Sequence, residues 1–187
     1  MHNIQSAAEK VIAEIPSKPC IVAIDGRCAA GKTTLAEKLR QELLCNVIHA
    51  DDFFLPPQRR TKERLEMPGG NIDYERILQD VLLPLKEKKD ALYRPYDCKS
   101  NSYGKEITVP YGGIIIVEGS YSCHPSLWEY YDFHIFLSVQ EAVQEERIRK
   151  RNTSSAEMFF NHWIPLEEKY FDAYKTEEQC ELNFILS

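Results

Sequence analysis

The feature that most constrains this chain is the segment GRCAAGKTT, which lies between a continuous apolar run and an amphipathic helix pattern. It fits the pattern G-x-x-x-x-G-K-[ST], with Gly26, Gly31, Lys32 and Thr33 at the fixed positions. The glycines let the backbone turn so that successive N–H groups point at phosphate oxygens, and the helix that begins here adds its positive end. A glycine-containing turn without a ligand is the alternative, but both flanking elements are those that a phosphate-binding loop requires.

This segment carries the groups that bind a nucleoside triphosphate. Lys32 is long enough to reach the β- and γ-phosphates, and the Thr33 hydroxyl can ligate Mg²⁺. We therefore predict that the loop holds a triphosphate together with Mg²⁺. The predicted loop residues are Gly26, Arg27, Cys28, Ala29, Ala30, Gly31, Lys32, Thr33 and Thr34.

Strand and helix patterns alternate along most of the chain. Short, nearly continuous apolar runs are typical of parallel strands that are covered on both faces, whereas apolar residues every three or four positions indicate amphipathic helices. The predicted strands are residues 20–25, 46–50, 112–119, 132–138 and 182–187. The predicted helices cover the first dozen residues, the segment with Leu35, Leu39 and Leu43, and residues 74–85, 140–151 and 166–174. This alternation predicts an α/β fold with a mainly parallel sheet.

Two stretches interrupt the alternation. Residues 56–70 are expected to form a long polar loop, and residues 91–111 a small strand-and-turn insertion. Loops of this length in compact domains are often functional. The 187 residues are enough for one domain with a substantial core, and we predict a single domain over residues 1–187.

Composition and charge exclude several classes of protein. The content of 43% hydrophobic and 28% charged residues is ordinary for a soluble globular protein, and the longest apolar run, residues 114–117, is too short to span a membrane. No secretory leader pattern is present. The net charge of −6 argues against a nucleic-acid-binding surface. Six scattered cysteines without a C-x-x-C pair predict free thiols in a reducing cytoplasm, with no disulfide and no structural metal.

Carboxylates follow two of the predicted strands. Asp51 and Asp52 follow the second strand, and Glu118 ends the strongest one. Ligands in such folds bind beyond the carboxyl ends of the strands, so we expect these acids beside the phosphate-binding loop. Glu118 can hold Mg²⁺ or its water, although an acid there can also face solvent or cap a helix. One acid of the Asp51–Asp52 pair can accept a proton from an attacking hydroxyl while the other supports the metal or a loop; simple turn residues are the alternative.

Five segments together resemble a known family. IDGRCAAGKTTLA, HADDFF, GGNIDYERIL, YRPYDC and IIIVEG occur in the order expected of the uridine kinase / phosphoribulokinase-like family of P-loop kinases, which also includes nicotinamide riboside kinases and bacterial pantothenate kinase. The resemblance covers roughly residues 21–174. It implies a three-layer α/β/α fold with a small insertion and a short lid near residues 147–163. It also implies phosphoryl transfer from ATP, with Mg²⁺, to a small-molecule alcohol.

The resemblance also assigns roles to individual residues. Asp51 matches the general base of the family and is predicted to act with Lys32, which leaves Asp52 as a metal support. Asp73 matches an acid that contacts the ribose hydroxyls of the acceptor, although it also precedes a helix pattern and can serve as an N-cap. The candidates for contact with a nucleoside base are Tyr93, Tyr96 and Asp97.

The segment ERIRKR matches the approach to the family's lid. Arg147 and Arg151 are four residues apart on one helix face, where like charges repel unless an anion lies between them. The triphosphate of ATP is such an anion, so both arginines are predicted to bind the nucleotide. The alternative is that these cations complement the dipole of the helix C-terminus.

Departures from the family pattern leave the acceptor open. The uridine-binding histidine expected after the Y-D pair is missing, because Lys99, Ser100 and Asn101 follow Cys98, and PGGNID replaces P-D-A-F-D. The 5′-hydroxyl of a nucleoside is the favoured acceptor; nicotinamide riboside, pantothenate and a non-catalytic nucleotide-binding regulator are the alternatives. A GTPase switch is disfavoured, because N-K-x-D and D-x-x-G are absent. We expect a small-molecule substrate, no nucleic-acid or membrane partner, and leave self-association open.

Overall fold

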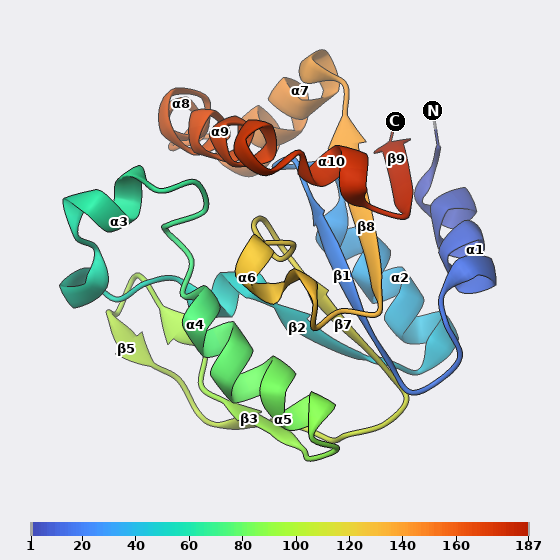
Figure 1. Cartoon of the computed structure of the whole chain (residues 1–187). Coiled ribbons are helices and arrows are strands. Elements are labelled where there is room, and N and C mark those ends of the chain that lie inside the picture. Colours follow the sequence, from blue (N-terminus) through green and yellow to red (C-terminus); the bar gives the residue numbers. More distant parts are fainter. Residues whose placement is uncertain (1, 187) are drawn as a thin grey trace.

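The computed structural model describes residues 2–186, and its centre is a five-stranded parallel sheet (Figure 1). The strand order is β2-β7-β1-β8-β9. The strands are β1 (Cys20–Gly26), β2 (Asn46–His49), β7 (Ile114–Glu118), β8 (Phe133–Val139) and β9 (Leu182–Leu186). All five lie where the sequence predicted strands, with limits that differ by one or two residues. Residue 187, the end of the predicted last strand, lies outside the described residues.

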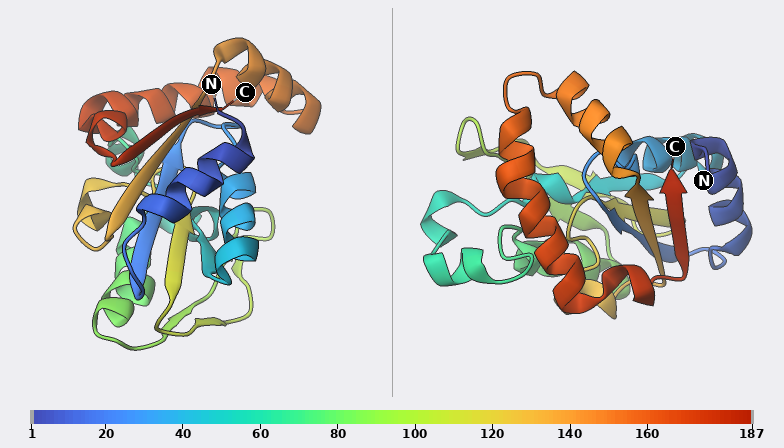
Figure 2. Two further views of the ribbon diagram at one scale, coloured as in Figure 1. Left: turned by 90° about the vertical axis from the view of Figure 1, so that its right-hand side faces the viewer. Right: turned by 90° about the horizontal axis from the view of Figure 1, so that it is seen from above.

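The register brings the carboxyl ends of three strands to one edge of the sheet. Ile24 of β1 pairs with Glu118 of β7 and with Ile135 of β8, while His49 of β2 also pairs with Glu118. Side chains immediately after these positions therefore meet above the same edge, which is where ligands bind in such sheets. The helices α7 (Glu141–Arg151) and α9 (Ile164–Tyr174) pass over this edge (Figures 1 and 2).

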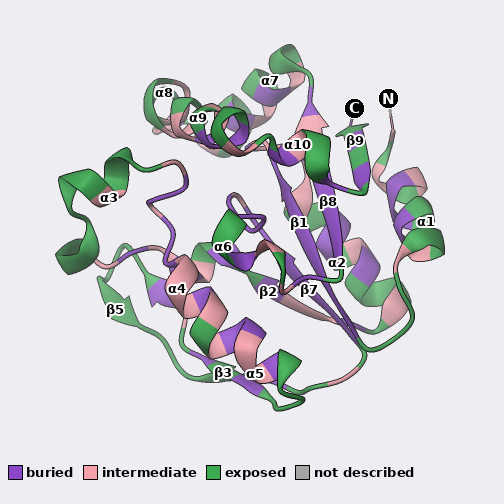
Figure 3. Ribbon diagram, viewed as in Figure 1, coloured by how far each residue is buried: buried purple, intermediate pink, exposed green. Residues whose placement is uncertain are grey.

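Helices cover both faces of the sheet. On one face, α1 (Ile4–Glu14) and α2 (Lys32–Leu43) pack through residues such as Val11 and Leu35 against the strands. On the other face, the helical segment from residue 74 to 86, α6 (Pro125–Trp128) and α9 contribute to a second core. Because both faces are covered, β1 and β7 are buried along their whole lengths (Figure 3).

Two helical segments contain π-helical turns, each followed by a proline. The first comprises α4 (Tyr74–Arg76), a π-helix at Ile77–Leu82 and α5 (Leu83–Lys86), which contains Pro84. The second comprises α8 (Ala156–Met158), a π-helix at Phe159–Trp163 and α9, with Pro165 near its start. Proline lacks a backbone N–H and crowds the preceding turn, so a widened turn there is the physical consequence.

The polar stretch at residues 56–70 is partly helical, which corrects the prediction of a loop. A 3₁₀ turn covers Pro57–Arg59, and α3 covers Lys62–Glu66. The hydroxyl of Thr61 accepts a hydrogen bond from the backbone N–H of Arg64 at 3.2 Å, so α3 has an N-cap. Thr61 as an N-cap was the sequence signal for this helix, but the charged residues around it made the stretch resemble a polar loop.

The predicted insertion at residues 91–111 forms two short antiparallel ribbons. β3 (Ala91–Tyr93) pairs with β6 (Ile107–Val109), and β4 (Tyr96–Asp97) pairs with β5 (Ser102–Tyr103). A last short helix, α10 (Thr176–Gln179), precedes β9. Within residues 2–186, no helix combines the length and apolarity needed to cross a membrane. All six cysteines are free thiols.

Gly26 fixes the contact between the end of β1 and β8. Its φ is +134°, and a Cβ at this position would lie 2.0 Å from the carbonyl oxygen of Leu137. We expect Gly26→Ala to lower the free energy of unfolding by about 3 kcal/mol or more, because the clash involves backbone atoms that cannot move separately. Urea unfolding measures this change.

Gly112→Ala is the matched control, because Gly112 also has a positive φ, +105°, but no atom within 4 Å of the added Cβ. We expect it to cost only about 1 kcal/mol. Equal losses in the two variants would show that backbone conformation, and not the clash with β8, makes Gly26 necessary.

Candidate active site

The phosphate-binding loop has the conformation that the sequence predicted. Gly26 and Gly31 have φ values of +134° and +103°, which only glycine adopts without strain, and Ala29 is also left-handed. The Lys32 Nζ donates hydrogen bonds to the carbonyl oxygens of Gly26 at 2.5 Å and Arg27 at 3.0 Å. Lys32 thus closes the loop on itself and brings its charge over the concave side.

The loop opens into a cavity of about 870 Å³, which is within the size range of small-ligand sites. Most of its wall comes from the loop and α2, the turn after β2, the segment after β7, α7, and the α8–α9 segment; Ile4, Asn71 and Leu186 complete it. The lining residues used below are Cys28, Ala29, Lys32, Thr33, Asp51, Phe54, Asn71, Glu118, Ser120, Tyr121, Arg147, Lys150, Arg151, Trp163 and Glu167.

Thr33 and Glu118 meet at the sheet edge and form the best candidate for a magnesium site. The Thr33 hydroxyl donates to Glu118 Oε1 at 3.0 Å, and the same oxygen is 2.6 Å from Nδ1 of His49. This hydrogen bond is the main cause that raises the pKa of His49. A hydroxyl with one carboxylate suits Mg²⁺, which usually completes its shell with water and phosphate oxygens. Within residues 2–186 no cluster of three or more His, Cys, Asp or Glu side chains could hold a metal by itself.

Asp51 and Asp52 lie in a 3₁₀ turn, Ala50–Phe53, that directly follows β2. The turn is held against the end of β7 because Gly119 leaves room for Ala50; a Cβ at Gly119 would be 2.8 Å from that of Ala50. The two acids then diverge. Asp51 lines the cavity, whereas Asp52 accepts a hydrogen bond from the Tyr93 hydroxyl at 3.3 Å and is not a lining residue.

The surroundings of Asp51 raise its pKa above the usual value. The protein atoms crowded around the cavity are the main cause, although the Asp51 side chain itself is exposed to the open space. The neighbouring Glu118 adds to the rise, while Lys32, His49 and Arg151 oppose it. A carboxylate with a raised pKa accepts a proton more readily than an ordinary one. Asp51 is therefore chemically suited to the role of general base that was predicted for it.

The structure keeps Asp73, Tyr96 and Asp97 out of the cavity wall. Asp73 is 0% exposed; it accepts from the backbone N–H of Arg76 at 3.2 Å as the N-cap of α4 and pairs with Arg59 at 2.5 Å. Tyr96 is buried, and Asp97 is exposed within the β4–β5 ribbon. Tyr93 is buried beside Asp52 and Phe53, behind the wall. The substrate contacts predicted for these residues remain predictions.

The helix α7 contacts the phosphate-binding loop directly. Arg147 donates to the carbonyl oxygen of Ala29 at 3.1 Å, and Gln144 donates to that of Cys28 at 2.9 Å. Arg147, Lys150 and Arg151 line the cavity, so this helix brings three cations to the end where phosphates are expected. Both arginines predicted to bind the nucleotide are thus placed beside the loop.

Asp25, which sequence reasoning missed, connects three parts of the site. It is 0% exposed, and its Oδ1 accepts from the backbone N–H groups of Gly26 at 2.7 Å and Tyr121 at 3.1 Å. Its Oδ2 accepts from the N–H of Cys123 at 3.0 Å and the hydroxyl of Tyr170 at 2.9 Å. Burial raises the pKa of Asp25, and the rise is opposed by the hydrogen bonds from Cys123, Gly26 and Tyr170 and by the charge of Lys32. The sequence signal that could have identified Asp25 was the presence of an acid in a strand that is otherwise apolar.

Glu167 and Ser120 were also missed. Glu167 lies on α9 and is 5% exposed; its Oε2 accepts from the backbone N–H of Cys28 at 2.9 Å, and its Oε1 accepts from the Ser120 hydroxyl at 2.6 Å. Ser120 in turn is 3.3 Å from Nζ of Lys32. No local sequence pattern could have paired Glu167 with Cys28, because they are 139 residues apart.

No family model matches this chain, and no curated protein matches it in sequence. Solved structures do match it over almost its whole length. A possible uridine kinase from Bacillus stearothermophilus is 18% identical, with 97% of this chain and 96% of that chain covered and a TM-score of 0.73. A protein from Silicibacter sp. TM1040, proposed to be a fructose transport system kinase, is 21% identical, with coverages of 98% and 100% and a TM-score of 0.69.

A third match is YFH7 from Saccharomyces cerevisiae, proposed to be a P-loop containing kinase with a circular permutation. It is 12% identical over the full length of both chains, with a TM-score of 0.67. These likenesses confirm the predicted fold, a mainly parallel sheet with flanking helices, which this chain shares with all three proteins. At such low identities they establish the fold alone.

The hydrogen bond from Tyr170 to Asp25 ties α9 to the end of β1. We expect Tyr170→Phe to lower the free energy of unfolding by about 1–2 kcal/mol, because a buried carboxylate loses one of its donors while the ring is kept. Thermal or urea unfolding measures this. Tyr174→Phe is the matched control on the same helix, and a similar loss in both variants would contradict the importance of the Asp25 contact.

Proposed function

We propose that this protein transfers the γ-phosphoryl group of ATP to a primary hydroxyl of a small molecule, with the 5′-hydroxyl of a nucleoside as the favoured acceptor. One observation carries the proposal. Asp51 lines the same cavity as Lys32, Thr33 and Glu118. A proton acceptor therefore faces a complete phosphate-binding loop across a space that can hold two small ligands.

The chain's own groups have distinct tasks in such a reaction. Lys32 and the loop N–H groups hold the phosphates, and Arg147 and Arg151 offset the charge that develops during transfer. Thr33 and Glu118 would hold Mg²⁺, which supplies further neutralisation of that charge. Asp51 orients the acceptor hydroxyl and removes its proton. Together α7 and α9 cover the cavity and limit the access of water.

Support for a nucleoside acceptor comes from the cavity wall and from the likeness to a possible uridine kinase. Phe54 and Trp163 both line the cavity, with ring centroids 6.4 Å apart. Aromatic side chains so placed offer flat apolar surfaces to a base or to a sugar ring. Nicotinamide riboside and pantothenate are the alternative acceptors.

The direct test is an ADP-release assay with Mg·ATP and a panel of uridine, cytidine, adenosine, nicotinamide riboside, pantothenate and simple sugars. We expect one acceptor to raise ADP release at least tenfold above the rate with ATP alone, because a bound hydroxyl replaces water as the nucleophile. Mass spectrometry of the product identifies the phosphorylated atom. ADP release that no acceptor stimulates would count against the proposal.

The rival function is a nucleotide-binding regulator without catalysis, for which an intact phosphate-binding loop would be enough; the presence of Asp51 and Glu118 beside the loop counts against it. Asp51→Asn separates the two. For a kinase we expect turnover to fall by about 10²–10⁴-fold, because the base is lost, while the Kd for ATP changes less than about threefold. Calorimetry measures binding and the ADP assay measures turnover. Full turnover in this variant would show that Asp51 is not the base.

A further inference from the structure

The cavity is divided by charge. Every lysine or arginine that lines it, within the described residues, comes from the phosphate-binding loop or from α7; these are Lys32, Arg147, Lys150 and Arg151. The carboxylates of the wall are Asp51, Glu118 and Glu167. In the proposed reaction the cations bind the phosphates of ATP, Glu118 would hold Mg²⁺, and Asp51 is the base. Glu167 is the one carboxylate of this set without an assigned role.

Glu167 is a buried carboxylate without an ion-pair partner among residues 2–186. Both of its oxygens accept hydrogen bonds from neutral donors, the Cys28 N–H and the Ser120 hydroxyl. The two bonds hold the side chain in one position at the wall. Burial raises the pKa of Glu167, while the charge of Lys32 and the two hydrogen bonds oppose that rise. The carboxylate has no ion-pair contact of its own in the described part of the chain, so its charge acts on whatever ligand occupies the cavity.

Glu167 lies on the same side of its helical segment as Trp163, and both side chains line the cavity. Trp163 precedes Glu167 by four residues and Tyr170 follows it by three, so the three side chains lie along one side of the helical segment. Trp163 is in contact range of Phe54, which follows the Asp51 turn. Glu167 therefore contacts the loop at Cys28 and lies on the same side of its helical segment as Trp163, beside the space proposed for the acceptor.

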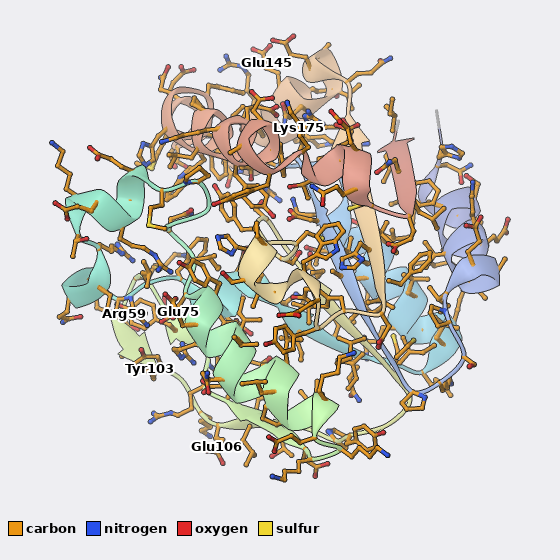
Figure 4. All side chains as sticks on the ribbon, in the orientation of Figure 1. Arg59, Glu75, Tyr103, Glu106, Glu145 and Lys175 are labelled. Atoms are coloured by element: carbon orange, nitrogen blue, oxygen red, sulfur yellow. The ribbon has the colours of Figure 1, made fainter. Side chains whose placement is uncertain are left out.

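Three arginines that lie before and within the first π-helical segment are already paired with acids, so they cannot bind an anionic acceptor. Arg59 pairs with Asp73 at 2.5 Å and with Glu75 at 3.4 Å, and Figure 4 shows Arg59 and Glu75 beside each other. Arg64 pairs with the same Glu75 at 2.6 Å, and Arg76 pairs with an acid one turn further along its own helix. None of the three lines the cavity.

Two neutral polar side chains complete this end of the wall. Asn71 and Tyr121 both line the cavity, and the amide of Asn71 interacts with the hydroxyl of Tyr121 in a contact that falls short of full hydrogen-bond geometry. Tyr121 is 3% exposed and is held at a positive φ of 71°. Buried polar atoms without a full hydrogen bond are costly, so a ligand with hydroxyl groups fits here.

We propose that the acceptor is an alcohol without a negative charge, and that Glu167 is the residue that excludes anionic alcohols. This rests on the proposed kinase function and narrows its substrate class. A second negative charge close to Glu167 is disfavoured because the buried carboxylate is poorly screened by solvent, whereas neutral hydroxyl groups can use Asn71 and Tyr121. Of the alternatives above, pantothenate, which is an anion, is disfavoured.

The test compares neutral and anionic members of matched pairs as acceptors: uridine with uridine 3′-phosphate, pantothenol with pantothenate, and fructose with fructose 6-phosphate. The ADP assay gives kcat/KM for each. We expect the neutral member of the best pair to be preferred by roughly 100-fold, and Glu167→Gln to reduce that preference about tenfold. Glutamine keeps the shape of Glu167: its amide oxygen can accept from the Cys28 N–H, and its amide N–H can donate to the Ser120 hydroxyl, so the unfolding temperature should change little. The preference is measured at saturating ATP, so a change in ATP affinity does not alter the ratio between two acceptors.

Asp172→Asn is the matched control, since it removes a carboxylate from the same helix. The side chain of Asp172 is 83% exposed. We expect it to leave the preference unaltered. Preference for an anionic member, or an unchanged preference in Glu167→Gln, overturns this inference while the kinase stands. Absence of transfer to every compound overturns the kinase proposal and this inference with it.

Discussion

The site depends above all on one buried carboxylate. Asp25 accepts hydrogen bonds from the start of the phosphate-binding loop, from two N–H groups of the segment after β7, and from Tyr170 of α9. Burying a charged group is costly unless it is fully hydrogen-bonded, and four donors meet that requirement here. The consequence is mechanical: the loop, the segment after Glu118 and the helix above the cavity are held in one arrangement.

The parallel sheet supplies the second constraint. Because β1, β2 and β7 run in the same direction and in register, the loop, the Asp51 turn and Glu118 emerge at one edge, although they are far apart in the sequence. The tight approach at Gly119 then brings the Asp51 turn against the end of β7. An alcohol and a triphosphate bound above this edge would be neighbours, which is the condition for in-line transfer.

Local sequence patterns were enough to predict the strands of the sheet and the glycine-containing loop. The continuous apolar runs gave all five strands, and the glycine spacing gave the loop, because a buried parallel strand and a φ-positive glycine each need particular residues. The same logic placed Lys32, Thr33, Asp51 and Glu118 together. Sequence patterns could not identify residues whose partners are far away in the chain. Glu167 and Tyr170 lie in an aromatic-rich helix, and the spacing of its aromatic residues indicates only core packing. Their contacts with Cys28 and Asp25 exist only after folding.

The most direct measurement of the central claim is a crystal structure with Mg²⁺ and a non-hydrolysable ATP analogue. It should show the β- and γ-phosphates within the loop formed by residues 26–33. The metal should be bound to the Thr33 hydroxyl and lie close to the Glu118 carboxylate. The Asp51 carboxylate should face the γ-phosphate across the space left for the acceptor. A nucleotide bound elsewhere, or a γ-phosphate directed away from Asp51, would contradict the assignment of this cavity as the site of phosphoryl transfer.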